Sequence, residues 1–232
     1  LSCFANQLTS LDVSNNTALT ELDCFENQLT SLDVSNNTSL MYFQLRGNLL
    51  TSLDISQNTA LVELSCGDNM LTSLDVSSNT ALTGLECYGS LLTSLDVSNN
   101  TALTHLECHN NQITSLDLSQ NTNLIDVLCS ENQLTSLDLR NGNNTNLDIN
   151  ATSNSDLTCI DVDDPTWATA NWTVGNGDID SWASFSGNCS GLGCMDSTAC
   201  NYDVYANVDD GSCDLPNGCG DPLYLEYDAS VT

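Results

Sequence analysis

The sequence predicts a mainly β solenoid of 21-residue repeats with short parallel strands, followed by a disulfide-containing cap and a small cysteine-rich acidic module. Three observations predict this architecture. One motif returns every 21 residues, apolar half-repeats lie about ten residues apart within it, and six cysteines crowd into the last third of the chain. A unit this short cannot shield its own apolar face, so copies must stack on one another.

The repeats occupy residues 1–158. The first copy reads LSCFANQLTSLDVSNNTALTE, and later copies begin at Leu22, Phe43, Leu64, Leu85, Leu106 and Val127. Apolar and polar residues alternate in the segments L-x-C and L-D-V, so we predict two short strands in each repeat. Parallel strands about 4.8 Å apart would stack the repeats into a rod on the order of 35 Å long. Because the first residues already belong to a repeat, we expect the chain to be part of a longer protein.

Two asparagines recur at fixed places in the repeat, and each forms a column along the predicted solenoid. The first column is Asn6, Asn27, Asn48, Asn69, Asn111 and Asn132, and the second is Asn16, Asn37, Asn58, Asn79, Asn100 and Asn121. An inward amide at a bend can bond backbone groups that the turn leaves unpaired. We therefore predict two structural hydrogen-bond ladders.

A column of cysteines also points inward, and it consists of Cys3, Cys24, Cys66, Cys87, Cys108 and Cys129. Leu45 replaces cysteine in the third repeat, which a purely apolar slot would allow. We predict buried free thiols that act as small apolar residues. A ladder of metal-bound thiolates is the alternative, but leucines flank the column.

The template L-x-C-x-x-N-x-L-T-S-L-D-V-S-x-N-T-x-L resembles the short leucine-rich repeats of secreted and surface proteins from marine Bacteroidota. The resemblance covers about two-thirds of the chain. It implies export by a type IX secretion route, with the protein anchored or released outside the cell. The cysteine-dense tail independently favours an oxidising, extracellular location.

Residues 159–190 are predicted to form the C-terminal cap of the solenoid. They carry Trp167, Trp172, Trp182 and Phe185, which offer enough aromatic area to cover the last coil. A disulfide bond between Cys159 and Cys189 would hold the cap in place. The alternative is a small carbohydrate-binding insertion that uses the tryptophans.

Residues 191–217 are predicted to form an acidic cysteine module, and residues 218–232 the start of a second, truncated copy. Within GCMDSTACNYDVYANVDDGSC we pair Cys194 with Cys213, whereas the partners of Cys200 and Cys219 stay open. The module resembles the G-C-T-D-P-x-A-x-N-Y-x-x-x-A-x-x-D-D-G-S-C repeats of exported Bacteroidota proteins. Its hard oxygen ligands suit calcium, and a solvated acidic turn is the equal alternative. The candidate ligands are Asp196, Asn201, Asp203, Asp209 and Asp210.

Places in the repeat that vary from copy to copy are the candidates for ligand recognition. Three columns of outward residues lie on the L-x-C strand, and they mix aromatic with polar side chains and one arginine. The candidates are Phe25, Tyr42, Gln44, Arg46 and Tyr88. Each alone is equally well explained as an ordinary exposed residue, so the prediction depends on their clustering.

The L-D-V segments instead present a regular acidic column, namely Asp12, Asp33, Asp54, Asp75, Asp96, Asp117 and Asp138. Stacked carboxylates about 5 Å apart repel one another, so they must be solvated, bonded to neighbouring hydroxyls or bridged by cations. Solvation with hydroxyl bonds is the simpler interpretation. A template for divalent cations, mineral or ice is an alternative function.

Catalysis is not predicted. His105, Glu107 and His109 lie on one strand face and could hold a transition metal, but the histidines are two pleats apart, roughly 13 Å. The chain has no lysine for Schiff-base chemistry, no glycine-rich phosphate loop and no convincing nucleophile beside a base. We interpret these side chains as variable exposed residues rather than as an enzyme site.

The charge balance narrows the partners further. Two basic and 31 acidic residues give a net charge of -29, which disfavours nucleic acid and anionic membranes. There is no apolar run long enough to insert into a membrane. We predict an extracellular binding or adhesion scaffold for a protein or glycan, joined in a longer chain to further modules. A structural surface or filament component is the alternative.

Overall fold

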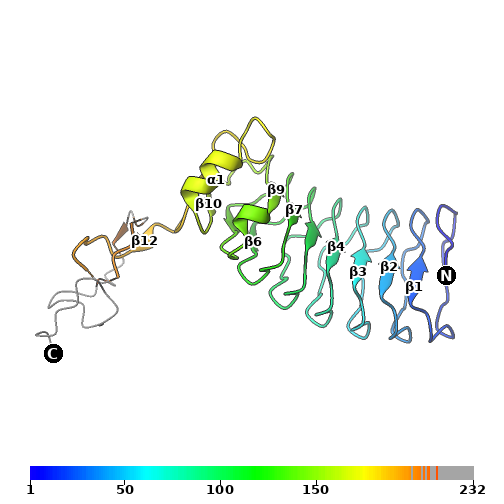
Figure 1. The fold of residues 1–232 in the computed structure, drawn as a ribbon. Helices are drawn as coiled ribbons and strands as arrows, with labels where there is room; N and C mark the ends of the chain where they lie inside the picture. Colours follow the sequence, from blue (N-terminus) through cyan, green and yellow to red (C-terminus); the bar gives the residue numbers. More distant parts are fainter. Residues whose placement is uncertain (200, 205, 207, 210–212, 214–232) are drawn as a thin grey trace, which may run out of the picture. The chain divides into compact units, whose positions relative to one another are not determined.

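The computed structural model describes residues 1–199, 201–204, 206, 208–209 and 213. The chain divides into two compact units, Leu1–Phe185 and Ser186–Thr232, which are described separately. The first unit is mainly a stack of narrow coils, each made by one repeat (Figure 1). Below, coils are numbered from the N-terminus, so that coil 3 is residues 43–63 and coil 5 is residues 85–105. No helix in the described part of the chain is long and apolar enough to cross a membrane.

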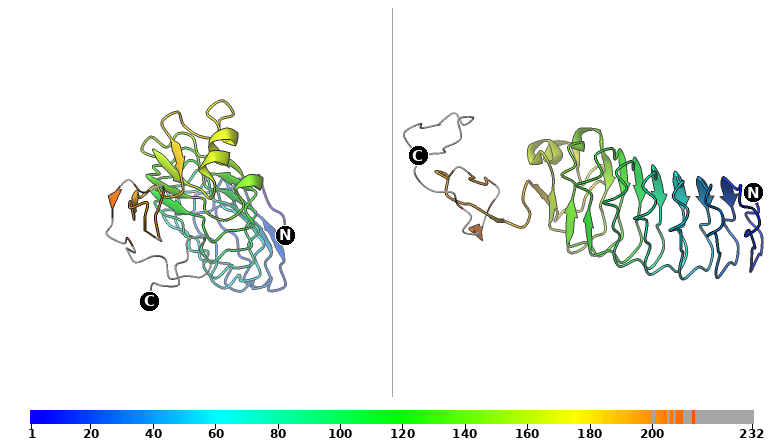
Figure 2. Two further views of the ribbon diagram at one scale, coloured as in Figure 1. Left: turned by 60° about the vertical axis from the view of Figure 1, so that its left-hand side comes forward. Right: turned by 90° about the horizontal axis from the view of Figure 1, so that it is seen from below.

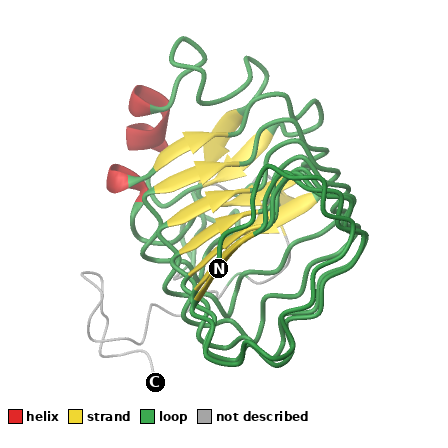
Figure 3. Cartoon of the chain, turned by 90° about the vertical axis from the view of Figure 1, so that its right-hand side faces the viewer, coloured by secondary structure: helices red, strands yellow, loops and turns green. Residues whose placement is uncertain are grey.

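One parallel sheet runs along the solenoid, with its strands in consecutive coils (Figures 1 and 2). Each strand is three residues long with its middle residue buried, and all except β9 fall at the predicted L-x-C segment. In sheet order the strands are β1 (Glu21–Asp23), β2 (Tyr42–Gln44), β3 (Glu63–Ser65), β4 (Gly84–Glu86), β5 (His105–Glu107), β7 (Asp126–Leu128) and β9 (Asp148–Asn150). Viewed along the solenoid, the strands line one side and loops complete each coil (Figure 3).

The second half of the repeat departs from the prediction. A second parallel sheet contains only β6 (Ser115–Asp117), β8 (Ser136–Asp138), β10 (Cys159–Asp161) and β11 (Ser184–Ser186). The prediction of two strands per repeat is therefore wrong for coils 1 to 5. Alternation shows that a segment is extended with one face buried, but it does not show whether the neighbouring segment is close enough to pair.

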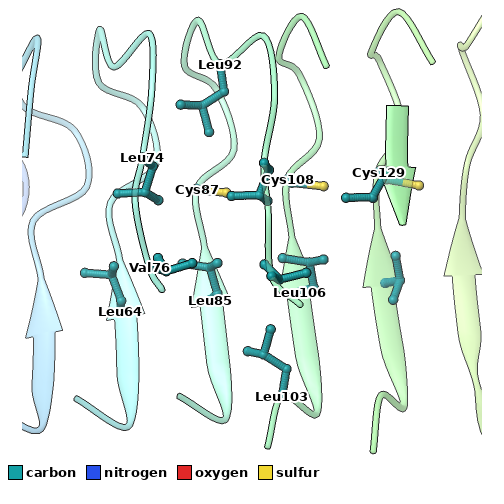
Figure 4. Packing of buried hydrophobic residues seen from close by; sticks show 14 of the residues in the cluster. Leu64, Leu74, Val76, Leu85, Cys87, Leu92, Leu103, Leu106, Cys108 and Cys129 are labelled. Atoms are coloured by element: carbon teal, nitrogen blue, oxygen red, sulfur yellow. The ribbon is translucent and has the colours of Figure 1, made fainter. Parts of the chain in front are cut away.

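The core fills the inside of every coil. Leucine, valine, isoleucine and cysteine side chains point inward and pack on their equivalents one coil away (Figure 4). Leu64, Leu85 and Leu106 follow one another in this way and are at most 1% exposed. Because each coil covers its neighbours, the apolar area that one repeat cannot shield becomes buried in the stack.

The inward cysteines are free thiols, as predicted. Burial raises the pKa of Cys66 and of Cys129 to about 12 and that of Cys87 well above its usual value. Leu45 is fully buried in the same column, so the slot accepts either residue. The column therefore contributes packing.

The two asparagine ladders are confirmed. In the first ladder, the Asn27 side-chain oxygen accepts from Leu8 N–H at 3.0 Å, while its amide nitrogen donates to Cys3 O at 3.1 Å and Cys24 O at 3.0 Å. In the second, Asn37 donates to Val13 O at 3.1 Å and Asn16 O at 2.9 Å. Each amide thus joins two coils at a bend where strand pairing has ended.

Aromatic side chains that follow the last coil pack against its core, and the bounds of the predicted cap stay a prediction. The short helices η1 (Asn144–Asn146) and α1 (Pro165–Asn171) lie here, and Asp164 caps α1 by accepting from Thr166 and Trp167 N–H. Trp172 is 4% exposed, and its indole N–H donates to Leu147 O at 3.2 Å. Trp167 and Phe185 pack on the same core. Trp167 and Trp172, which the alternative prediction assigned to sugar binding, are therefore used in packing, whereas Trp182 is half-exposed.

The second unit contains a two-stranded parallel sheet of β12 (Leu192–Gly193) and β13 (Val208–Asp209). A disulfide bond joins Cys194 to Cys213, which is the predicted pairing. Cys159 and Cys189 each form a disulfide bond, and the pairing of these two cysteines with each other stays a prediction. Cys200 and Cys219, whose partners stayed open, lie outside the described residues, as does the predicted second module of residues 218–232.

Candidate functional site

The outward face of the β1–β9 sheet carries the predicted variable columns in register. The first column runs through Glu21, Tyr42, Glu63, Gly84, His105 and Asp126, and the second through Asp23, Gln44, Ser65, Glu86, Glu107 and Leu128. Residues 21 positions apart in sequence thus become direct neighbours across paired strands. The outward residues that differ between successive repeats therefore form one continuous surface on the sheet.

The third predicted column forms two stacks beside the sheet. The rings of Phe4 and Phe25 are parallel with centroids 4.6 Å apart, and the Arg46 guanidinium carbon lies 5.1 Å from the Phe25 centroid. Arg46 also lies 3.8 Å from a Glu26 carboxylate oxygen. Parallel rings and an overlying guanidinium stabilise one another through the ring quadrupole. Phe25 and Arg46 are therefore already engaged with each other.

The second stack lies further along the column and joins Tyr88 to His109, with parallel rings 4.7 Å apart. Gly67 makes room for it, because a Cβ at Gly67 would come within 3.1 Å of the Tyr88 ring. The Nδ1 atom of His109 is buried and has no hydrogen-bond partner. This ring is thus held in the stack and is not directed to the sheet face.

A hollow of 340 Å³ opens on the strand face over β2 to β5. Its position follows from Gly84, which leaves a gap in the first column between the side chains of Glu63 and His105. The residues whose side chains surround the gap are Tyr42, Gln44, Glu63, Ser65, Glu86, His105 and Glu107. The rim of the hollow therefore consists mainly of residues that differ between coils. Its floor is the apolar residue that each strand directs inward.

Carboxylates dominate the electrostatics of the hollow. Glu63, Glu86 and Glu107 line it, and Ser65 Oγ donates to Glu86 at 2.7 Å. Burial raises the pKa of Glu107, the charges of Glu86 and Asp126 raise it further, and the two nearby histidines oppose the shift. Burial is the main cause of this raised pKa, and the neighbouring carboxylates add to it. A positively charged group entering the hollow would relieve this crowding of carboxylates.

The predicted ligand-binding residues are only partly brought together. Tyr42 and Gln44 line the hollow, whereas Phe25, Arg46 and Tyr88 lie in the neighbouring stacks. His105 and Glu107 line the hollow too, but His109 stacks on Tyr88. In the described part of the chain no three His, Cys, Asp or Glu side chains are placed to hold a metal ion. The structure therefore does not assemble the proposed transition-metal ligands.

The calcium candidates lie in the second unit. Asp196 accepts from the backbone N–H of Thr198, and Asp203 accepts from the Asn188 side-chain amide at 2.8 Å. Asn201 and Asp209 are among the described residues, whereas Asp210 lies outside them. Calcium binding by this module stays a prediction.

The acidic column on the opposite side of the coils has a local role. In coil after coil the aspartate oxygen accepts the backbone N–H two residues later, as Asp54 does from Ser56 at 3.0 Å. These bonds lower the pKa of Asp54 and of its equivalents Asp12 and Asp75. Each carboxylate thus stabilises a turn in its own coil.

One variable column was missed by sequence reasoning. Leu49, Met70 and Leu91 are 43%, 41% and 44% exposed, and they occupy a place that is glutamine in four other coils. Those glutamines are Gln7, Gln28, Gln112 and Gln133. Comparison of every place in the repeat would have revealed the column, but attention to the strand alone did not.

Comparison with known proteins agrees with this geometry. No protein-family model and no curated protein sequence matches the chain. Among solved structures, the functional domain of InlJ from Listeria monocytogenes, described as including a cysteine ladder, is 34% identical with a TM-score of 0.54, over 85% of this chain and 50% of that one. Internalin C2 of the same species is 18% identical with a TM-score of 0.63, over 80% and 79% of the two chains. A Leptospira interrogans leucine-rich-repeat protein is 22% identical with a TM-score of 0.59, over 76% and 53%.

These findings define a leucine-rich-repeat solenoid. The chain is similar in sequence and in fold to the functional domain of the internalin InlJ. It spans about half the length of the InlJ domain. The likeness to internalin C2 and to the Leptospira protein shows the shared fold.

Proposed function

We propose that this chain is a non-catalytic, extracellular scaffold that binds a protein ligand on the strand face, with the hollow around Gly84 as the centre of the site. The observation that carries the proposal is the contrast between the two sides of each strand. Inward places repeat leucine and cysteine, whereas outward places change from coil to coil and surround a hollow. Residues that differ where the fold makes no demand are free to serve recognition.

The class of ligand is supported by the fold and the charge. Relatives with this solenoid include internalins and Toll, and the latter was solved in complex with Spätzle. Two basic and 31 acidic residues argue against nucleic acid and anionic membranes. A glycan is the second candidate, because aromatic and polar side chains mix on the strand face.

An extracellular location is supported by the disulfide between Cys194 and Cys213, since such bonds persist in oxidising compartments. The Bacteroidota origin and the type IX route are proposed only on the resemblance of the repeats and of the acidic module. Calcium as a stiffening ligand of that module is likewise a proposal. Isothermal titration of the purified chain with calcium, with and without chelator, tests it.

Replacement of Gly84 by tyrosine tests the binding site. At the equivalent position of other coils stand Tyr42 and His105. A Cβ atom at Gly84 would lie 3.6 Å from the Glu63 side chain, which is an ordinary van der Waals distance. The fold therefore tolerates a side chain that fills the hollow. The matched control is Glu21→Tyr, at the same place in an exposed position outside the hollow.

The assay measures binding of wild type and both variants to a panel of purified extracellular proteins, with a glycan array in parallel. We expect protein ligands that bind wild type and E21Y but not G84Y, with all three melting temperatures alike. Ligands that bind G84Y as well as wild type would contradict the site. If glycans bind wild type but not G84Y, the site stands and its ligand class is carbohydrate instead of protein.

A further inference from the structure

The missed column forms an exposed apolar stripe, with one residue in each of three consecutive coils. Leu49, Met70 and Leu91 lie in coils 3, 4 and 5. The backbone N–H of each donates to the preceding coil, from Leu49 to Leu29 O at 2.9 Å and from Met70 to Leu50 O at 2.8 Å. These bonds hold consecutive members one coil spacing apart, so the three side chains form a continuous exposed row.

The fold does not require an apolar residue at this place. Exposed glutamine stands there in coils 1, 2, 6 and 7, and the next residue of each coil supplies the core contact. Leu50, Leu71 and Leu92 are those next residues, and all are fully buried. Exposed apolar area is unfavourable in water by about 25 cal/mol per Å² and is normally scattered. A row of three exposed apolar side chains in adjacent coils indicates a surface that a binding partner covers.

The stripe lies close to the hollow along the chain. Gln44, Ser65 and Glu86 line the hollow, and each is followed five residues later by Leu49, Met70 and Leu91 respectively. Five residues span at most about 17 Å, and here the chain also bends. The bend is sharp because Gly47, Asp68 and Gly89 adopt left-handed backbone angles, with φ of 67°, 49° and 60°. One short segment of a partner can therefore reach both features.

We infer that the stripe and the hollow form one docking surface for a basic segment of a partner protein, whose aliphatic side chains pack on Leu49, Met70 and Leu91 while a lysine or arginine enters the hollow. This inference rests on the proposed function. Its basis is charge complementarity, because Glu63, Glu86 and Glu107 surround the hollow.

A second copy of the chain does not suit the stripe. Two chains of net charge -29 repel each other, and each has only two arginines with which to meet the carboxylates of the other. A basic partner gains from the same field, which would also speed its association at low salt.

The test uses substitutions that the repeat itself supplies. In the triple variant L49Q/M70Q/L91Q each residue becomes the one found at that place in the other coils, so the fold is kept. The matched control is Ile125→Thr, which removes an apolar residue of 44% exposure and installs the threonine found in coils 1, 4 and 5 as Thr20, Thr83 and Thr104. The probe is a fluorescent synthetic peptide of alternating lysine and leucine, compared with one of alternating lysine and serine.

We expect the lysine–leucine peptide to bind wild type and I125T equally, and the triple variant about tenfold or more weakly, which corresponds to roughly 1.4 kcal/mol or more. The lysine–serine peptide should bind wild type weakly and not distinguish the variants. Added salt should weaken all binding. Unchanged affinity in the triple variant, or no binding to wild type at low salt, would overturn the inference.

The variant G84Y separates this inference from the proposed function. If G84Y loses peptide binding and the triple variant keeps it, the hollow is the binding site and the stripe takes no part in binding. If the triple variant loses peptide binding and G84Y keeps it, both the joint surface and the hollow as a binding site are refuted. Sedimentation that shows a wild-type dimer, abolished in the triple variant, would assign the stripe to self-association instead.

Discussion

Replacing Ser90 with asparagine should stabilise the solenoid, because this residue interrupts the first asparagine ladder. Asn69 and Asn111 occupy the same place in the flanking coils and are 6% and 8% exposed, while Ser90 is 7% exposed. The environment is therefore equally buried in all three coils. The hydroxyl oxygen of Ser90 has no hydrogen-bond partner, so this coil lacks the bonds that the amide makes elsewhere.

The magnitude follows from those missing bonds. Asn111 accepts from Leu92 N–H at 3.0 Å and donates to Cys87 O at 3.0 Å and Cys108 O at 3.1 Å. By the repeat, an asparagine at 90 would accept from Leu71 N–H and donate to two carbonyls. Three net bonds of about 0.5–1.5 kcal/mol each, less about 1 kcal/mol for ordering the side chain, give a gain of roughly 0.5–3.5 kcal/mol.

The assay is urea unfolding followed by circular dichroism, together with hydrogen exchange of the Leu71 amide. We expect a higher unfolding midpoint and slower exchange at Leu71. The reverse substitution Asn69→Ser is the matched control and should lower the midpoint by a similar amount. A midpoint that does not rise, with Leu71 exchange unchanged, would refute the account of the ladder.

Three further predictions concern the core, the cap and the turns. Iodoacetamide at pH 8 should leave Cys66 unmodified in the native protein and modify it after unfolding, as judged by mass spectrometry, because burial raises its pKa to about 12. Trp172→Ala should destabilise the solenoid by about 3–5 kcal/mol in urea unfolding, since a buried aromatic and its bond to Leu147 O are lost. Hydrogen bonds from Ser56 lower the folded-state pKa of Asp54, so the stability that this carboxylate adds is fully present above its unfolded pKa and is lost as pH falls through the folded value. Acid should therefore lower the melting temperature, and D54A should weaken this dependence.

The sequence predicted the strand positions and the outward columns because both depend on one local rule. In an extended segment alternate side chains face opposite sides, and a strict 21-residue period carries that assignment from coil to coil. The neighbours of Tyr42 in the first column, Glu21 and Glu63, followed directly. The asparagine ladders followed for the same reason, since a polar residue at a buried place needs partners.

The hollow and the stacks could not be predicted in the same way. The gap at Gly84 exists only in three dimensions, because Glu63 and His105 flank it from the two neighbouring coils. The Tyr88–His109 stack depends on ring orientation, which the period does not specify. The missing second strands in coils 1 to 5 depend on whether neighbouring coils pair their backbones there, which alternation within one repeat does not specify. All three are properties of neighbouring coils in three dimensions.

Departures from the repeat accumulate in the same stretch of chain, and this coincidence links the fold to its use. Coils 3 to 5 contain Leu45 in place of cysteine, Ser90 in place of asparagine, and Gly67 and Gly84 in place of larger outward side chains. Ser90 leaves a buried hydroxyl unpaired, so this change weakens the solenoid without improving its packing. Gly67 and Gly84 instead open space for the Tyr88 stack and for the hollow. The stripe of Leu49, Met70 and Leu91 falls in these coils as well, so the region where the repeat is least regular is the one with the most features suited to a ligand.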